Sequence, residues 1–96
     1  MTLNVLLVLR AFLAADGEER YGLQVMQLTG VPSGTMYPLL LRLESEGWLT
    51  SRLEEAGPAS EGRPLRRYYL LTATGAGQAR AVVDQAVKQL SAKAAS

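Results

Sequence analysis

The chain contains no cysteine and no histidine among its 96 residues. Without cysteine it cannot form disulfides, thiolate zinc sites or a cysteine nucleophile. Without histidine it lacks the commonest metal ligand, the commonest general base and the side chain that titrates near neutral pH. We therefore predict that the protein is not an enzyme and that it holds no cofactor and no metal ion.

Aromatic residues are also scarce, at 6% of a chain that is 48% hydrophobic. The core is therefore expected to be aliphatic, built from leucine, valine and alanine. A chain of this length is expected to form one domain, over residues 1–96, and to bury only about 60 to 65% of its unfolded surface. Oligomerisation would therefore add to its stability.

Long apolar runs are missing as well, since a membrane span needs about 18 uninterrupted apolar residues. The apolar N-terminal stretch is not preceded by a basic residue, and Arg10 interrupts it. Leu13 also stands where a signal-peptide cleavage site needs a small residue. These features predict a cytoplasmic protein without membrane contact.

Neither sign of charge dominates, because ten basic and nine acidic residues leave a net charge of +1. Three arginines nevertheless cluster within five positions, at Arg63, Arg66 and Arg67. Such a cluster can bind a phosphate backbone. The alternative is a solvated hairpin tip.

Apolar residues at spacings of three and four predict a first helix within residues 1–15. This helix is hydrophobic on nearly every face, so it needs cover on more than one side, and another subunit would supply the second cover. A second, shorter helix is predicted from about Arg20 to Thr29. Gly30 then follows as its left-handed C-terminal cap.

A third helix is predicted to open at Ser33 or Thr35, because either hydroxyl can accept hydrogen bonds from the first amides of a helix. With Thr35 as the cap, Pro38 would lie in the first turn, where its missing N–H costs nothing. Met36, Leu40 and Leu43 form the apolar stripe of this helix, and Gly47 closes it.

Residues 48–71 are predicted to form a β-hairpin, with strands at Trp48–Glu54 and Arg66–Leu71 around a tip rich in glycine, proline and serine. Alternation points four side chains of these strands into the core: Leu49, Leu53, Tyr69 and Leu71. Trp48 is expected to be a packing residue, and it is a secondary candidate for a ligand pocket.

Thr72 is expected to cap a last helix over residues 73–92, whose apolar stripe is rich in alanine and valine. Small side chains of this kind permit close approach of another helix. The residues after Leu90 are expected to fray.

A helix, a turn, a second helix and a basic hairpin in this order describe a winged helix-turn-helix, with residues 20–46 as the helix-turn-helix and residues 48–71 as the wing. A protein of this kind presents the opening turn of its recognition helix to DNA, where hydroxyls and free amides bind phosphate oxygens. The alternatives are a capped surface helix and, for Tyr37, a half-buried ring. The predicted DNA contacts are Ser33, Thr35, Tyr37 and Arg42 of the third helix, and Arg63, Arg66 and Arg67 of the wing.

Three segments carry a family resemblance: "YGLQVM" at Tyr21–Met26, "SGTMYPLLLRLESEGWL" at Ser33–Leu49 and "RRYYLLTATG" at Arg66–Gly75. With them the chain resembles the PadR family of winged-helix transcription regulators, particularly its short members that lack a separate C-terminal domain. It departs from the family at Leu41, where a basic residue is common. It also has no aromatic residue in the segment 73–96, where some short members use one to bind aromatic effectors.

The resemblance implies a homodimer whose first and last helices interlock, with two recognition helices on a palindromic operator. The expected interface residues are Leu3, Leu7, Phe12, Val82, Val83, Ala86 and Leu90.

We therefore predict a mainly α fold with a small β-hairpin, a winged helix-turn-helix with an additional C-terminal dimerisation helix. The predicted function is a homodimeric repressor that binds double-stranded DNA and that a small-molecule effector releases, with Trp48 as the weak candidate for the effector pocket. The alternatives are a winged-helix protein-interaction module and an accessory or plasmid-partition DNA-binding protein.

Overall fold

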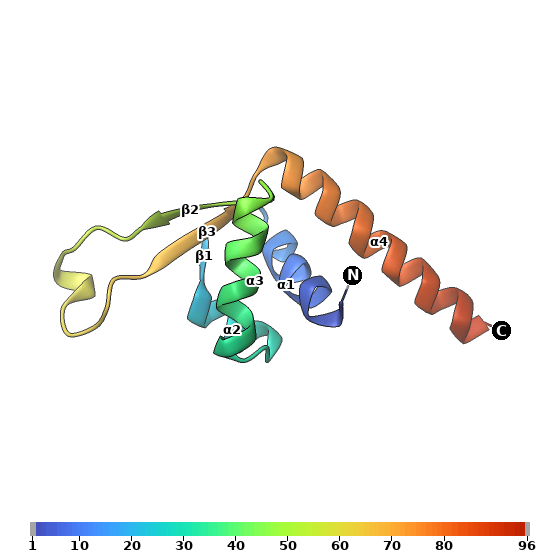
Figure 1. The fold of residues 1–96 in the computed structure, drawn as a ribbon, viewed down its shortest axis with the longest axis horizontal. Helices are drawn as coiled ribbons and strands as arrows, with labels where there is room; N and C mark the ends of the chain where they lie inside the picture. Colours follow the sequence, from blue (N-terminus) through green and yellow to red (C-terminus); the bar gives the residue numbers. More distant parts are fainter. Residues whose placement is uncertain (1, 96) are drawn as a thin grey trace.

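The computed structural model describes residues 2–95 and has four α-helices and a three-stranded antiparallel sheet. The β2–β3 hairpin and helix α4 extend in opposite directions from a centre made by α1, α2 and α3 (Figure 1). The elements in chain order are α1 (Leu3–Ala14), β1 (Arg20–Tyr21), α2 (Gly22–Thr29), α3 (Ser33–Ser45), β2 (Leu49–Leu53), a 3-10 turn (Pro58–Ser60), β3 (Arg67–Leu71) and α4 (Ala73–Ala95).

The predicted winged helix-turn-helix is confirmed. The first position of the predicted N-terminal helix, and the two outermost positions of the predicted domain 1–96, lie outside the described residues.

The core lies where α1, α2 and α3 meet the sheet, and it is aliphatic as the composition indicates. Its largest fully buried side chains are Val8, Leu9, Val25, Met36 and Leu40. Burying each such side chain contributes about 1.5 to 3 kcal/mol. The predicted stripe of α3 therefore holds the recognition helix on the domain and leaves its other faces open.

The second helix begins two residues later than predicted, because Arg20 and Tyr21 form strand β1. These residues pair with Tyr69 and Tyr68 of β3, so the sheet has the order β1-β3-β2. Arg20 also donates from Nε to the carbonyl of Ala11 at 2.9 Å. A strand of two residues has no periodicity, so the sequence pattern alone could not distinguish it from the first turn of the helix.

Helix α3 begins at Ser33, one of the two predicted starts, but its N-cap is Pro32, so the capping role predicted for Ser33 or Thr35 is wrong. Ser33 and Thr35 instead lie within the first turn, and the carbonyl of Pro32 accepts the amides of Thr35 and Met36 at 3.0 and 2.8 Å. Pro38 therefore lies inside the helix, where it cannot donate the usual hydrogen bond to the carbonyl of Gly34.

The end of α3 is the predicted one. Gly47 adopts the left-handed conformation with φ +81°, and its amide donates to the carbonyl of Glu44 at 3.0 Å. The amide of Trp48 donates to the carbonyl of Leu43 at 2.9 Å, which completes a Schellman motif. Gly30 ends α2 in the same conformation, also as predicted.

Leu53 was wrongly predicted to lie in the core, since its side chain is 50% exposed. Leu49 and Tyr69 are buried and Leu71 is partly buried, as alternation indicates. Alternation identifies which side chains share a face of the sheet, but not how far the helices extend beneath it. The hairpin projects beyond the helices at Leu53.

Thr72 caps α4 as predicted, because its Oγ1 accepts the amide of Gly75 at 2.9 Å and donates to the carbonyl of Gly47 at 2.7 Å. Gly75 packs so closely on the backbone of Trp48 that a Cβ there would overlap the Trp48 carbonyl. The helix continues to Ala95, so the predicted fraying after Leu90 is wrong. Within the part of the chain that the structure describes, no helix is both long and apolar enough to cross a bilayer.

Candidate nucleic-acid interface

The opening turn of α3 is an exposed helix N-terminus. Ser33, Gly34 and Thr35 are all exposed, and Pro32 has no side chain that could cap them. The amides of Ser33 and Gly34 find no acceptor among residues 2–95. Free amides and the positive end of the helix dipole make this turn suited to an anion.

Tyr37 extends this exposed end towards α2. A Cβ on Gly22 would lie only 2.7 Å from the ring atom Cε1 of Tyr37, so the ring packs on the glycine that begins α2. The side chain remains 48% exposed, and its hydroxyl has no hydrogen-bond partner among the described residues. The ring of Tyr37 is therefore half-buried, which was one of the two predictions for this residue. Its hydroxyl remains available to a phosphate, which was the other.

Arg63 is engaged inside the wing. Its Nη1 and Nη2 donate to the two carboxylate oxygens of Glu54 at 2.8 and 3.0 Å, and further bonds reach the carbonyls of Ala59 and Pro64. This pair is largely shielded, with the side chains 28% and 14% exposed. The structure therefore makes Arg63 a brace of the hairpin tip, and its role as a DNA contact stays a prediction.

Glu54 holds the strand that returns from the hairpin tip, in addition to its pairing with Arg63. Its Oε1 accepts the backbone amide of Arg66 at 3.1 Å, and its own amide donates to the carbonyl of Arg66 at 2.7 Å. The hydrogen bonds from the Arg63 side chain and from the Arg66 backbone lower the pKa of Glu54 from 4.5 to about 2. One carboxylate thus orders both sides of the wing around the arginine cluster.

Arg66, directly before β3, and Arg67, its first residue, have different partners. The guanidinium of Arg66 lies over the ring of Tyr21, 4.1 Å from its centroid, and makes no hydrogen bond among residues 2–95. Arg67 donates from Nη1 to Oγ of Ser51 at 3.2 Å, and that hydroxyl in turn donates to Glu44 of α3. The two arginines therefore differ in how much of their hydrogen-bonding capacity is available.

Sequence reasoning missed Arg52 and Tyr21. Arg52 forms a two-pronged ion pair with Glu19, at 2.7 and 2.8 Å, and lies over the ring of Tyr68. This hydrogen bonding lowers the pKa of Glu19. The alternation of the strands could have indicated that Arg52 and Tyr68 share the outer face of the sheet, but the position of Tyr21 depends on β1.

A groove of about 410 Å³ joins the wing to the helix-turn-helix. Tyr37 lines it from α3, and Arg66 and Arg67 line it from the wing. The remaining lining residues come from β1, α2, the wing and β3: Tyr21, Gly22, Leu23, Arg63, Pro64, Leu65 and Tyr69. The structure therefore brings Tyr37 together with the predicted wing residues, although the segments are separated in the sequence.

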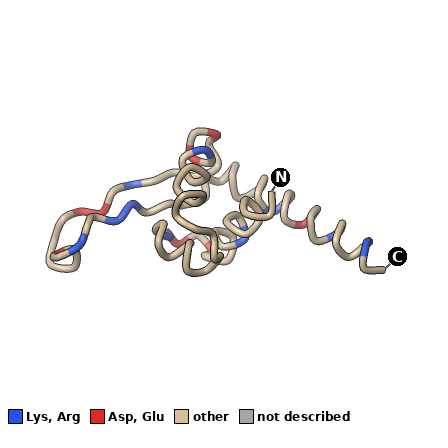
Figure 2. Tube along the Cα trace, turned by 60° about the horizontal axis from the view of Figure 1, so that its bottom comes forward, with Lys and Arg blue, Asp and Glu red and all other residues tan. Residues whose placement is uncertain are grey.

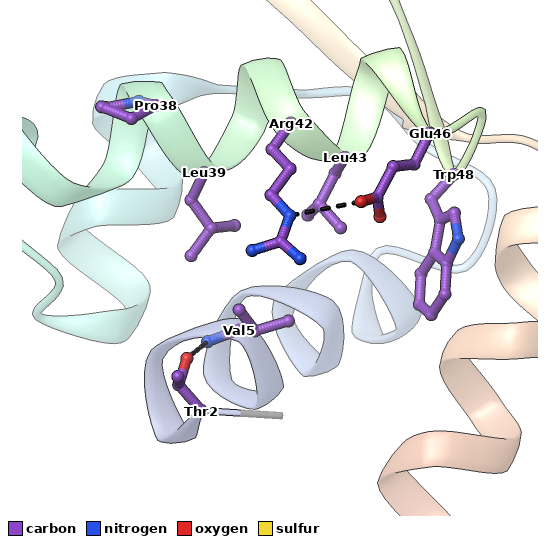
Figure 3. A pocket seen from close by; sticks show the side chains of 8 residues that line it. All are labelled: Thr2, Val5, Pro38, Leu39, Arg42, Leu43, Glu46 and Trp48. Atoms are coloured by element: carbon purple, nitrogen blue, oxygen red, sulfur yellow. Dashed lines mark hydrogen bonds and ion pairs between the residues drawn. The ribbon is translucent and has the colours of Figure 1, made fainter.

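Arg42 does not join this set. It projects from α3 towards α1, where it pairs with Glu46 at 3.2 Å, and it lines a depression of about 510 Å³ together with Trp48 (Figure 3). Val5, Leu39 and Leu43 supply apolar walls to the same depression. Arg42 thus lies outside the groove that holds Tyr37 and the wing arginines, and its role as a DNA contact stays a prediction. The candidate pocket residue Trp48 does lie at a hollow.

The faces of α1 and α4 carry the exposed apolar surface. Leu3 and Leu90 are each 69% exposed and, with Leu6 and Ala86, line one shallow hollow between the two helices. Leu7, Val82 and Val83 are partly buried. Phe12 is only 3% exposed, inside the core of its own chain, so its assignment to a subunit interface is wrong.

Charged residues of both signs are interleaved along the hairpin (Figure 2). The acidic ones do not gather into a cation site, since residues 2–95 contain no group of three or more carboxylates or other ligands that could hold a metal ion. The acidic partners instead engage arginines, as Glu54 and Glu19 do.

Comparison with known proteins agrees with this arrangement. A family model described as the transcriptional regulator PadR-like family matches residues 12–81. Comparison with curated proteins finds no match.

Several solved structures are similar over nearly the whole chain. A PadR family transcriptional regulator from Eggerthella lenta is 28% identical, with 94% of this chain and 77% of that chain covered and a TM-score of 0.73. A PadR-like transcriptional regulator from Bacillus cereus is 27% identical, with 94% and 85% covered and a TM-score of 0.68. A protein of Streptococcus mutans is 26% identical, with 94% and 86% covered and a TM-score of 0.69.

Proposed function

Because this chain belongs to the PadR-like family of transcriptional regulators, and is therefore a DNA-binding regulator and not an enzyme, we propose that it acts as a homodimeric repressor in the cytoplasm. The opening turn of α3 enters the major groove of each half of a palindromic operator, and the wing contacts the flanking phosphates. Bound in this way, the dimer blocks transcription.

One observation carries the DNA-binding part of this proposal. The exposed end of α3 and the unpaired guanidinium of Arg66 belong to one continuous surface, because Tyr37 and Arg66 line the same groove. Helix amides and Tyr37 provide neutral donors for phosphate, and the arginine provides a charged one. Ser33 and Thr35 are close enough to the end of the helix to contact base edges.

The apolar surface on α1 and α4 supports the dimer. Leu3 and Leu90 are large apolar side chains that a monomer leaves in contact with water. They line the same hollow, so they form one apolar patch that a partner could cover. Val82, Val83 and Ala86 continue this face along α4. Two copies related by a two-fold axis would cover it with the same surface of the partner.

The depression lined by Trp48 and Arg42 supports release by a small molecule. It has apolar walls, one aromatic ring and the Arg42–Glu46 ion pair, and it lies between the recognition helix and α1. A ligand seated there would contact both the DNA-reading helix and a helix of the proposed dimer interface. Since α4 carries no aromatic residue, this hollow is the effector site that we propose.

The test is fluorescence anisotropy of purified protein with DNA from its own upstream region, at roughly 50 and 200 mM salt, with unrelated DNA as competitor. We expect competitor-resistant binding with two subunits per site. Replacing both arginines (Arg66→Ala with Arg67→Ala) should weaken binding to every sequence and flatten the salt slope by about one unit per lost phosphate contact.

Arg80→Ala is the matched control, because Arg80 is an exposed arginine on α4 away from the groove. It should leave the salt slope nearly unchanged. No binding by the unaltered protein at low salt would contradict the proposed function and favour a protein-interaction module.

A further inference from the structure

The outer face of the sheet carries two arginine-on-tyrosine stacks. The guanidinium carbon of Arg66 lies 4.1 Å from the ring centroid of Tyr21, and that of Arg52 lies 4.9 Å from the ring centroid of Tyr68. The two rings meet edge to face, with centroids 5.7 Å apart and planes at 82°. Arginine and tyrosine side chains of three strands thus form one connected row.

The two stacks differ in what remains available on the guanidinium. Arg52 commits Nε and Nη2 to the carboxylate of Glu19. The guanidinium of Arg66 donates no hydrogen bond to residues 2–95, so all five of its N–H groups remain available. Stacking holds a guanidinium by its face and leaves its edge unused.

A guanidinium with a fixed plane and a free edge is suited to a phosphate group, which it binds through two parallel hydrogen bonds. An arginine without such support must be ordered when DNA binds, and this ordering reduces the affinity. Arg66 also lines the groove that contains Tyr37, so the stacked guanidinium and the recognition helix share one surface. The ring of Tyr21 therefore prepares Arg66 for contact before DNA arrives.

Tyr21 is itself held firmly. As part of β1 it pairs with Tyr68, whose ring packs against its own. Tyr68 lies under Arg52, and Arg52 is tied to Glu19 in the loop that precedes β1. The platform beneath Arg66 is thus connected to an ion pair that joins β2 to the loop before β1.

We propose that Tyr21 is a positioning residue that orients Arg66 for two-pronged contact with a DNA phosphate, and that Arg66 contributes more to DNA affinity than Arg67 or Arg63. This inference rests on the proposed function, since it presupposes binding to DNA. It adds a residue outside the recognition helix and wing to the DNA-binding surface, and it ranks the three clustered arginines.

A double-mutant cycle tests the inference, with anisotropy measured for the unaltered protein, Tyr21→Leu, Arg66→Ala and the combined variant. We expect Tyr21→Leu to weaken DNA binding by about two- to fivefold, the range of an exposed cation–π contact. In the Arg66→Ala background the same change should have almost no further effect, because the residues act as a unit. Tyr21→Phe, which keeps the ring, should bind as the unaltered protein does.

Two controls separate positioning from loss of structure. Tyr68→Leu also removes half of the ring pair but leaves Arg66 on its platform, so it should weaken DNA binding less than Tyr21→Leu does. Arg52→Ala removes a stacked arginine whose Nε and Nη2 are already bonded to Glu19, and it should lower the salt slope less than Arg66→Ala. Urea unfolding of each variant establishes that the proteins compared are folded.

The inference is overturned if Tyr21→Leu weakens binding equally in both backgrounds, if Tyr68→Leu has the same effect as Tyr21→Leu, or if Arg52→Ala matches Arg66→Ala. In each of these cases the unaltered protein still binds DNA and the proposed function stands. Failure of the unaltered protein to bind any DNA would instead overturn the proposed function.

Discussion

The wing and the α1–α4 end of this molecule differ in whether their side chains find partners within the chain. In the wing, charged groups find partners within the chain: Arg63 with Glu54, and Arg52 with Glu19. On α1 and α4, by contrast, Leu3 and Leu90 remain exposed. The wing end is therefore complete as a structure and offers spare donors to a ligand, whereas the helical end is the part that gains from being covered.

The same contrast appears on a smaller scale within the arginine cluster. Arg63, Arg66 and Arg67 look equivalent in the sequence, but the first is braced by a carboxylate, the second is stacked with its edge free, and the third bonds a serine hydroxyl. A cluster of arginines in the sequence therefore shows that several cations lie near one another, but it does not show which of them have free hydrogen-bond donors.

The largest expected effect comes from charging the helical end. Leu90→Glu would place a carboxylate in the proposed dimer face, where burying it unpaired is costly. We expect monomers by analytical ultracentrifugation and a loss of operator affinity of about a hundredfold, since two half-sites are no longer bound together.

Leu53→Glu is the matched control, because Leu53 is an exposed leucine on the wing. It should leave the subunits associated. If Leu90→Glu also remains dimeric, the contrast drawn between the two ends is wrong.

A smaller effect, on the stability of the fold, is expected where the start of α4 packs on Trp48. Gly75→Ala places a Cβ against the backbone of Trp48, which cannot move aside as a flexible side chain would. We expect a loss of about 2 to 3 kcal/mol in the free energy of unfolding, as for other overpacked sites.

Gly77→Ala on the same helix has open space around its Cβ. It should instead stabilise the protein by up to about 1 kcal/mol through helix propensity. Urea unfolding distinguishes the two, and equal effects would refute the close contact at Gly75.

The smallest effect is a loosening of the wing in acid. The pKa of Glu54 is lowered from 4.5 to about 2 in the folded protein. Its bonds to Arg63 and Arg66 therefore stabilise the wing fully above about pH 4.5 and are lost as the pH falls towards about 2.

We expect the amide of Arg66 to exchange faster with solvent over this interval, as measured by NMR. Glu54→Gln should show rapid exchange already at neutral pH. The exchange rates are corrected for the intrinsic effect of pH. If the protection of the Arg66 amide then stays the same between pH 5 and pH 2, Glu54 does not hold the wing as described.

The site was predictable only where its signals were local. The hydroxyls at the start of α3 and the arginine cluster are adjacent in the sequence, so they could be named as candidates. The N-cap of α3 could not be assigned correctly, because Ser33, Thr35 and Pro32 are all compatible with a helix start, and only the hydrogen bonds to the carbonyl of Pro32 decide among them. Leu53 was misplaced because alternation does not show where the supporting helices end.

The class of fold, the aliphatic core, the glycine caps and the order of helix, turn, helix and wing could all be predicted from the residues alone. These follow from periodicity and from backbone preferences that act within a few residues. The tertiary structure alone decided that Tyr21 lies beneath Arg66, that Glu54 engages Arg63, and that Arg42 faces Trp48 and α1. The physical reason is that pairing of distant strands and docking of helices set these contacts, and no local pattern encodes which of several similar side chains will be left free.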